Sequence, residues 1–248
     1  MLALLTNDDG YEAEGLRRLA KEVARICSVL VVAPHINQSA AGHSLTLQRP
    51  LRINRIGPDY YSVDGTPTDA VMVAMYGILN NRRPDIILSG INRGPNMGDD
   101  VTYSGTVSAA FEGAILGIPS IAFSSVEFEN INYVVMARFA RKLTAKVLER
   151  GLPDFTLLNV NLPNPPADGF KGVMATRLGK RVYRDIVVEK IDPRGEKYYW
   201  IAGEPEWSDA ELSDYSATKE GYISITPLKM DMTDFSFREE LARWGLKP

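Results

Sequence analysis

The sequence predicts an α/β fold built on a Rossmann-like, mostly parallel sheet, and two patterns carry this prediction. Short apolar runs typical of strands buried on both faces alternate with longer segments whose apolar residues recur at helical spacing. Strands joined through helices form parallel, right-handed units. Polar, glycine-bearing segments follow several of the strands, and ligands bind at such strand ends in open α/β sheets.

The first strand–helix–strand unit comprises Leu2–Leu5, the amphipathic segment Gly15–Arg25 and Val29–Ala33. A second helix is expected from Thr66, which can cap it, with Pro67 at the first helical position. Other helices are expected from Ser104 and across Val135–Val147, and other strands at Leu45–Leu47, Leu51–Ile56, Tyr60–Val63, Asp85–Leu88, Pro119–Phe123 and Thr156–Val160.

The composition changes after Gly179. Two alternating segments, 181–190 and 196–201, flank the turn residues 192–195 and predict a β-hairpin. A solvated acidic loop at 204–214, a strand at 221–226 and a terminal helix at 233–244 should follow. We therefore divide the chain into an α/β core, 1–179, and a C-terminal part, 180–248. Because a hairpin outside the main sheet leaves strand edges uncovered, we expect it to pair with another subunit.

The composition narrows the class of protein. The chain has 248 residues, a formal net charge of −3 and one cysteine, so we expect neither a nucleic-acid polymer as partner nor an internal disulfide. We see no basic, apolar leader at the N-terminus and no run approaching the ~18 apolar residues of a membrane helix. We expect a cytoplasmic protein that does not bind a membrane.

The first strand ends in Asn7, Asp8, Asp9 and Gly10. Neighbouring carboxylates repel each other unless a cation lies between them, and oxygen ligands favour Mg²⁺, Mn²⁺ or Ca²⁺. The alternative is an Asp-Gly turn with two solvated acids.

The polar loop after the second strand contains Ser39 and both histidines of the chain, His35 and His43. The hydroxyl of Ser39 could bind a metal. His43 could act as an acid or base, or it could only order its own loop. Zinc binding by the two histidines is a weaker alternative, because a third histidine or a thiolate cluster is lacking.

A glycine-rich segment, 89–100, follows the strand at Asp85–Leu88 and carries Asn92 and Asn96, whose amides suit a metal and a phosphate. The helix after it opens with Ser104, Gly105 and Thr106. Free backbone amides and hydroxyls at a helix N-terminus bind anions, although ordinary serine capping explains the same residues. Because several strand ends meet at one sheet edge, these groups predict a site for phosphoryl transfer or phosphate-ester hydrolysis.

The sequence resembles the SurE family of metal-dependent 5′-nucleotidases along essentially its whole length. The resemblance rests on motifs in the family's order: Thr6–Gly10, Val32–Pro34, Ser39–Ala40, Gly42–Ser44, Gly65–Pro67, Ser89–Gly98, Tyr103–Val107, Gly195–Trp200 and Gly221–Pro227.

The resemblance implies one divalent cation, Mg²⁺ or Mn²⁺ before Ca²⁺, and a nucleoside 5′-monophosphate as substrate, with 3′-monophosphates and short polyphosphate as further substrates. It implies a three-layer core and a cytoplasmic homodimer or homotetramer. The implied metal ligands are Asp8, Asp9, Ser39 and Asn92, and the implied phosphate-binding residues are Asn96, Ser104, Gly105 and Thr106.

We expect direct attack by a water that the cation activates, rather than a phosphorylated Asp8, because the Asp-x-Asp spacing of such enzymes is absent. Asp9 is the first candidate for the general base and His43 the second. The alternative function is a non-catalytic nucleotide or phosphate sensor on the same fold.

Overall fold

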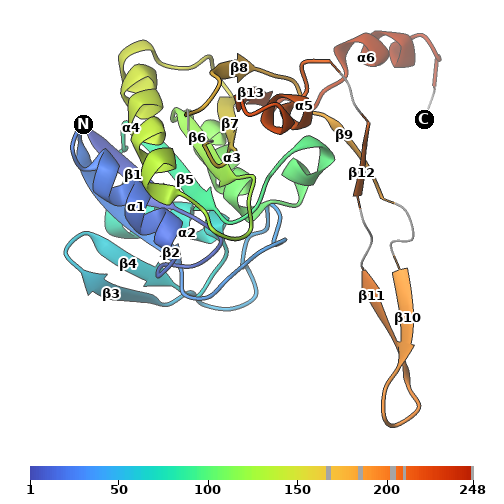
Figure 1. Cartoon of the computed structure of the whole chain (residues 1–248), viewed down its shortest axis with the longest axis horizontal. Coiled ribbons are helices and arrows are strands. Elements are labelled where there is room, and N and C mark those ends of the chain that lie inside the picture. The colour runs from blue at the N-terminus through green and yellow to red at the C-terminus, as the bar shows by residue number, and fades with distance from the viewer. Residues whose placement is uncertain (166–168, 184–186, 202–204, 209–210, 247–248) are drawn as a thin grey trace.

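The computed structural model describes residues 1–165, 169–183, 187–201, 205–208 and 211–246. It shows an α/β body from which a hairpin and a C-terminal helix project (Figure 1). The helices are α1 (Glu14–Val23), α2 (Pro67–Val73), α3 (Gly105–Ile115), α4 (Tyr133–Arg150), α5 (Asp214–Lys219) and α6 (Phe235–Ala242), with a π-helical turn at Ala74–Ile78 and a 3-10 helix at Gly98–Thr102.

The main sheet has nine strands in the order β3-β4-β2-β1-β5-β6-β7-β13-β8. The strands from β4 to β7 are all parallel, whereas β3 and β13 run antiparallel to a neighbour. The strands of this sheet are β1 (Leu2–Thr6), β2 (Ser28–Pro34), β3 (Ile53–Gly57), β4 (Tyr60–Val63), β5 (Ile86–Asn92), β6 (Ser120–Ser125), β7 (Thr156–Leu162), β8 (Val173–Ala175) and β13 (Ile223–Lys229).

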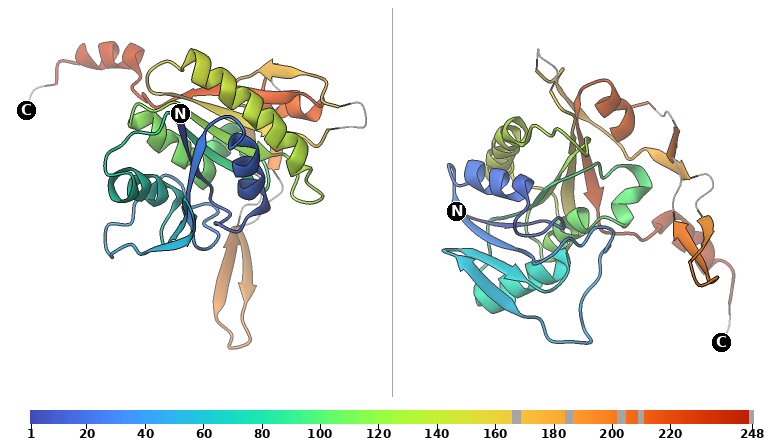
Figure 2. Two further views of the ribbon diagram at one scale, coloured as in Figure 1. Left: turned by 90° about the vertical axis from the view of Figure 1, so that its left-hand side faces the viewer. Right: turned by 60° about the horizontal axis from the view of Figure 1, so that its bottom comes forward.

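Helices cover both faces of the sheet, so the body has three layers (Figure 2). Leu5 faces the core under α1 and α4, and Leu4 faces the core under α2 and α3, because successive strand residues point to opposite faces. The expected mostly parallel, three-layer α/β fold is thus confirmed. None of the described helices has the length and apolar character needed to cross a bilayer.

Two elements differ from the prediction. The segment 45–47 is not a strand, because the amide and hydroxyl of Thr46 bind the carboxylate of Asp69 in α2 at 2.9 and 2.6 Å. The strand expected to end at Leu88 continues as β5 to Asn92. Gly90 makes this possible: its φ is +126°, and a Cβ there would lie 2.2 Å from the carbonyl oxygen of Phe123.

The C-terminal hairpin is present as β10 (Val187–Ile191) and β11 (Lys197–Ile201), which pair antiparallel. Nearer the body, β9 (Lys180–Tyr183) pairs with β12 (Pro205–Ser208) (Figure 1). Residues 184–186 of the predicted first strand lie outside the described residues. The acidic segment 204–214 is not simply a solvated loop, since it contains β12 and ends at the buried Asp214.

The division at residue 179 stays a prediction. The strand β13 lies between β7 and β8 in the main sheet, so part of the chain after residue 179 packs with the body. The helix α6 was expected at 233–244 and is present.

Candidate metal and phosphate site

Three strand ends meet at the paired acids Asp8 and Asp9, which follow β1 after Asn7. The backbone amide of Gln38, beyond β2, donates to the carbonyl oxygen of Asp8 at 2.7 Å. The backbone amide of Arg93, beyond β5, donates to Asp9 Oδ2 at 3.0 Å. The carboxyl ends of β2, β1 and β5 therefore form one edge, as their parallel register requires.

Ser39 and Asn92 are chain neighbours of these two donors and bring further oxygen atoms to the same edge. Asn37 Oδ1 accepts the backbone amide of Ser39 at 2.7 Å, and the Ser39 hydroxyl has no hydrogen-bond partner among the described residues. Asn92 is only 8% exposed, and its Nδ2 donates to the carbonyl oxygen of Gly94 at 2.9 Å. This bond orients the amide and leaves Asn92 Oδ1 available.

The N-terminus of α3 holds Asp8 from another side. The backbone amide of Thr106 donates to Asp8 Oδ2 at 3.1 Å, and the Thr106 hydroxyl donates to Asp8 Oδ1. Ser104 caps the helix by accepting the amide of Val107 at 3.0 Å. Since the backbone amides of Thr106 and Val107 are already bonded, the donors still available here are the hydroxyl of Ser104 and the backbone amide of Gly105.

Asn96 is fixed by polar side chains of β6 and β7. Its backbone amide donates to Asn161 Oδ1 at 2.9 Å, and its carbonyl oxygen accepts from the amides of Asn159 and Asn161 at 2.8 and 2.9 Å. The side-chain Nδ2 donates to Ser124 Oγ at 2.7 Å. One N–H of the Asn96 amide remains for a ligand.

The two histidines have different partners. The Nε2 of His43 lies 2.9 Å from Glu112 Oε2 on α3, and the Glu112 side chain is 10% exposed. His35 instead stacks on Tyr11, with ring centroids 5.5 Å apart. Within the described residues, no three His, Cys, Asp or Glu side chains are grouped so that they could hold a metal, which leaves zinc binding by the histidines without support.

Burial sets the electrostatics of the two acids. It raises the pKa of Asp8, and the hydrogen bonds from Thr106 oppose this shift. Burial, followed by the negative charge of Asp8, raises the pKa of Asp9 from 3.8 to about 6. Two close carboxylates with raised pKa values favour a cation between them.

A buried oxygen that the sequence prediction missed lies beside these acids. Asn7 Nδ2 donates to the carbonyl oxygen of Gly10 at 2.9 Å, whereas Asn7 Oδ1 is buried without a hydrogen-bond partner among the described residues. Together with the carboxylates, the Ser39 hydroxyl and Asn92 Oδ1, the donor set consists of oxygen atoms. It fits a hard divalent cation such as Mg²⁺ or Mn²⁺.

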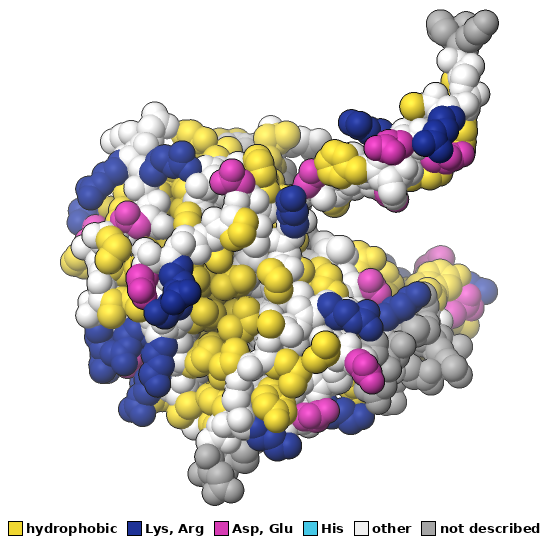
Figure 3. Space-filling model, turned by 90° about the horizontal axis from the view of Figure 1, so that it is seen from above, with side chains coloured by type: hydrophobic (Ala, Val, Ile, Leu, Met, Phe, Trp, Pro, Cys, Tyr) yellow, Lys and Arg dark blue, Asp and Glu magenta, His cyan; other side chains and the backbone are white. Residues whose placement is uncertain are grey.

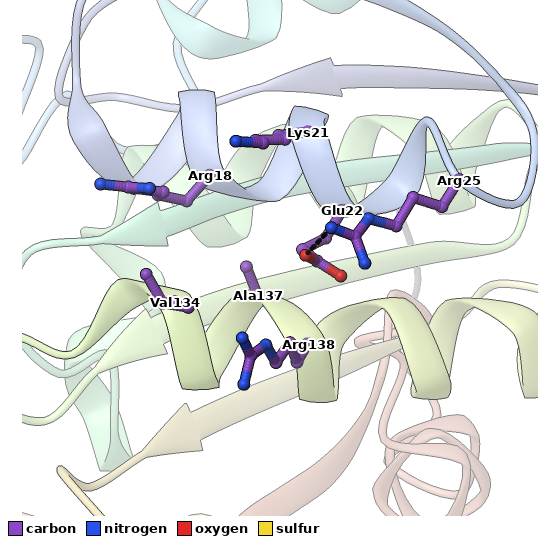
Figure 4. A pocket seen from close by; sticks show the side chains of 7 residues that line it. All are labelled: Arg18, Lys21, Glu22, Arg25, Val134, Ala137 and Arg138. Carbon is purple, nitrogen blue, oxygen red and sulfur yellow. Dashed lines mark ion pairs between the residues drawn. The ribbon is translucent and has the colours of Figure 1, made fainter.

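Two hollows elsewhere on the surface contain none of the predicted site residues. One, of about 130 Å³, lies between α1 and α4 (Figure 4). In it Glu22 pairs with Arg25 at 3.3 Å, and Arg141 of α4 approaches the same carboxylate at 3.6 Å. The second of these pairs links the two helices, so we assign this hollow to helix packing. The other lies beside α5.

Comparison with known proteins gives a consistent result. The model of the family "Survival protein SurE" matches residues 3–185. A "5′-nucleotidase SurE" of Geotalea daltonii is 49% identical over 248 residues, covering 99% of this chain and all of the relative. One of Aquifex aeolicus is 48% identical over 240 residues, covering 96% of each chain. The crystal structure of the SurE protein from Aquifex aeolicus superposes with a TM-score of 0.89 at 46% identity and covers 98% of this chain and 99% of that one.

Proposed function

Because the chain belongs to the Survival protein SurE family, we infer that it is a 5′-nucleotidase, which hydrolyses nucleoside 5′-monophosphates to nucleoside and phosphate. The observation that carries the inference is the junction of Asp8 with Thr106. This contact joins the edge of the sheet that carries the oxygen ligands to the N-terminus of α3. The cation site and the anion site are therefore adjacent, with Asp8 between them.

One divalent cation, Mg²⁺ or Mn²⁺ before Ca²⁺, is held in this proposal by Asp8, Asp9, Ser39 and Asn92. When bound, it neutralises phosphate charge and lowers the pKa of a water molecule. Asp8 is orientated for this role by the two donors of Thr106, and Asn92 by its bond to the carbonyl oxygen of Gly94.

In this proposal the substrate phosphate is bound directly by Asn96, Ser104 and Gly105, and indirectly by Thr106. The Gly105 amide, the Ser104 hydroxyl and the remaining N–H of Asn96 donate to its oxygens, and they stabilise the charge that develops on them. Thr106 acts mainly by fixing Asp8 against the phosphate site, because both of its donors already bind that carboxylate.

The general base in this proposal is Asp9, whose Oδ2 is bonded to the Arg93 amide and whose Oδ1 remains available. His43 is the alternative, and Glu112 would then hold its imidazole through Nε2. The further substrates, 3′-monophosphates and short polyphosphate, use the same phosphate donors.

Chelation of the metal tests the enzyme against a non-catalytic nucleotide sensor. Phosphate release from a nucleoside 5′-monophosphate should fall to background in EDTA and return when excess Mn²⁺ is added, because charge neutralisation at the phosphate is lost without the cation. Tight nucleotide binding without turnover in Mn²⁺ and in Mg²⁺ would identify a sensor instead.

Replacing Asp9 with asparagine should stabilise the metal-free protein at pH 8. The folded-state pKa of about 6 exceeds the ordinary value of 3.8, so the folded protein takes up a proton. Protonated Asp9 leaves the folded state at its full stability below about pH 4. As the pH rises through the folded pKa, ionisation of Asp9 lowers the free energy of unfolding by up to about 3 kcal/mol. Thermal unfolding in EDTA should therefore show a higher Tm for Asp9→Asn at pH 8, and the gain should vanish near pH 4.

The same variant separates stability from metal binding. Mn²⁺ should raise the Tm of the wild-type protein at pH 8, because a ligand that binds the folded state stabilises it, and should raise that of Asp9→Asn much less. An equal response of both proteins to Mn²⁺ would exclude Asp9 from the metal site.

Self-association through the C-terminal part completes the proposal, as a homodimer or homotetramer. The hairpin exposes Val187, Ile191, Trp200 and Ile201, the last by 87%, and α6 buries none of its residues. Figure 3 shows α6 extending from the body as a separate projection that carries apolar side chains. A lone hairpin is marginally stable in water, so a second subunit is the partner that would cover it.

Light scattering on the full chain tests this assembly, and a mass of one subunit at all concentrations would contradict it. A cytoplasmic location, which the resemblance to the family implies, is part of the proposal.

A further inference from the structure

One buried carboxylate connects the loop of the proposed phosphate site to the base of the projecting hairpin. Asp214 is 0% exposed and begins α5. Its Oδ2 accepts the backbone amide of Gly98 at 2.9 Å, and its Oδ1 accepts those of Gly179 and Tyr215 at 2.8 and 2.9 Å. The carboxylate thus binds three amides from three separate segments of the chain.

The packing around the amides of Gly98 and Gly179 leaves no room for side chains. Gly98 has φ +55°, and a Cβ on it would lie 3.0 Å from the Gly179 carbonyl oxygen and 3.1 Å from Trp207 Cζ3. A Cβ on Gly179 would lie 2.9 Å from Asp214 Oδ1. The segments therefore meet at backbone distance, where the shift of one displaces the other.

Aromatic and charged side chains close the same junction. Trp207 stacks on Tyr215 with ring centroids 4.6 Å apart, and the guanidinium of Arg181 lies 5.4 Å from the centre of the Trp207 ring. Arg181 also forms an ion pair with Asp100, which lies two residues after Gly98 in the chain. The strands β9 and β12, which carry the hairpin, thereby hold the segment 98–100 in place.

The segment held in this way lies two residues after Asn96. On its other side Asn96 is fixed by Asn159, Asn161 and Ser124. Asn92, by contrast, lies within β5 and is positioned by strand pairing. Loss of the Asp214 contacts should therefore displace Asn96 more than Asn92.

We propose that Asp214 is a positioning residue for the nucleotidase reaction. Through the Gly98 amide it sets the position of Asn96, and through the Gly179 amide it links Asn96 to the base of the hairpin. The inference rests on the proposed function, because it assigns Asn96 to the phosphate. Asp214 itself touches no substrate. Its effect is on phosphate binding, and metal binding is left nearly unchanged.

The variant Asp214→Asn tests the proposal, because it keeps the size of the side chain but places an NH₂ group against one of the three amides. A displacement of Asn96 should raise KM for a nucleoside 5′-monophosphate and the inhibition constant of inorganic phosphate together, by about 10- to 100-fold. The affinity for Mn²⁺, measured by calorimetry without substrate, should change less than about threefold.

Ser213→Ala is the matched control. Ser213 Oγ caps the same helix by accepting the Ser216 amide at 3.0 Å, but the Asp214 carboxylate keeps its contacts in this variant. Loss of the cap should lower the Tm, as loss of a cap does, without changing KM or phosphate inhibition.

The outcomes separate the possibilities. Wild-type KM and phosphate inhibition in a folded Asp214→Asn protein would overturn the proposal, and so would an equal rise of KM in Ser213→Ala. If Asp214→Asn does not fold, Gly179→Ala decides. Its new Cβ would lie 2.9 Å from Asp214 Oδ1 and displace the carboxylate, so unchanged KM and phosphate inhibition would overturn the proposal. Failure of the proposed function is distinct, because the wild-type protein would then release no phosphate in Mn²⁺.

Discussion

Replacing Asp8 with asparagine should reduce metal-dependent hydrolysis of a nucleoside 5′-monophosphate by at least about 1,000-fold. The variant keeps the shape of the side chain, and its carbonyl oxygen can still accept one donor of Thr106. The variant removes the negative charge of Asp8, which lies between the cation site and the N-terminus of α3. Phosphate release at saturating Mn²⁺ measures the loss, and circular dichroism shows whether the fold persists.

Asp59→Asn is the matched control for the loss of one carboxylate. Asp59 lies exposed in the turn between β3 and β4 with φ +51°, a conformation that asparagine also tolerates. This variant should keep wild-type kcat and KM. Full activity of Asp8→Asn, with the fold intact, would remove Asp8 from the site.

Adding a methyl group at Gly105 should lower kcat/KM by about 100-fold, because it displaces the reacting groups. The new Cβ would lie 2.9 Å from Asp8 Cβ and 3.1 Å from both Asp8 Oδ2 and Pro67 Cγ. Asp8 is buried and bound to Thr106, so it cannot move away without losing those contacts. Steady-state kinetics of Gly105→Ala with Mn²⁺ measures the effect.

Gly57→Ala supplies the control, because a Cβ at Gly57 meets only Tyr60 Cβ, at an ordinary 4.0 Å. Its kinetics should match those of the wild-type protein. If Gly105→Ala also retained wild-type kcat/KM, the close approach of α3 to Asp8 would have no catalytic importance.

The sequence predicted the fold and the meeting of the strand ends because both depend on local patterns. Buried apolar runs such as Leu2–Leu5 identify parallel strands, and parallel register then brings Asp8, Gln38 and Arg93 to one edge without further information. The cap of α2 was predictable for the same reason, since Thr66 and Asp69 form a capping box within four residues.

Features that depend on contacts between distant segments were missed. Nothing near Asp214 in the sequence indicates that its carboxylate binds amides at Gly98 and Gly179, so it was assigned to a solvated loop. Glu112 likewise lies in a helix with ordinary spacing, 69 residues from the His43 that it binds. The continuation of β5 to Asn92 was missed because glycine usually interrupts strands.

In this account the cation site and the phosphate site are adjacent at Asp8. The most direct test of this arrangement is a crystal structure of the protein with Mn²⁺ and a nucleoside 5′-monophosphate. The account predicts an anomalous Mn²⁺ peak coordinated by oxygen atoms of Asp8, Asp9, Ser39 and Asn92, with the phosphate between that ion and the Gly105 amide. A Mn²⁺ ion coordinated elsewhere, or a phosphate bound away from the N-terminus of α3, would contradict it.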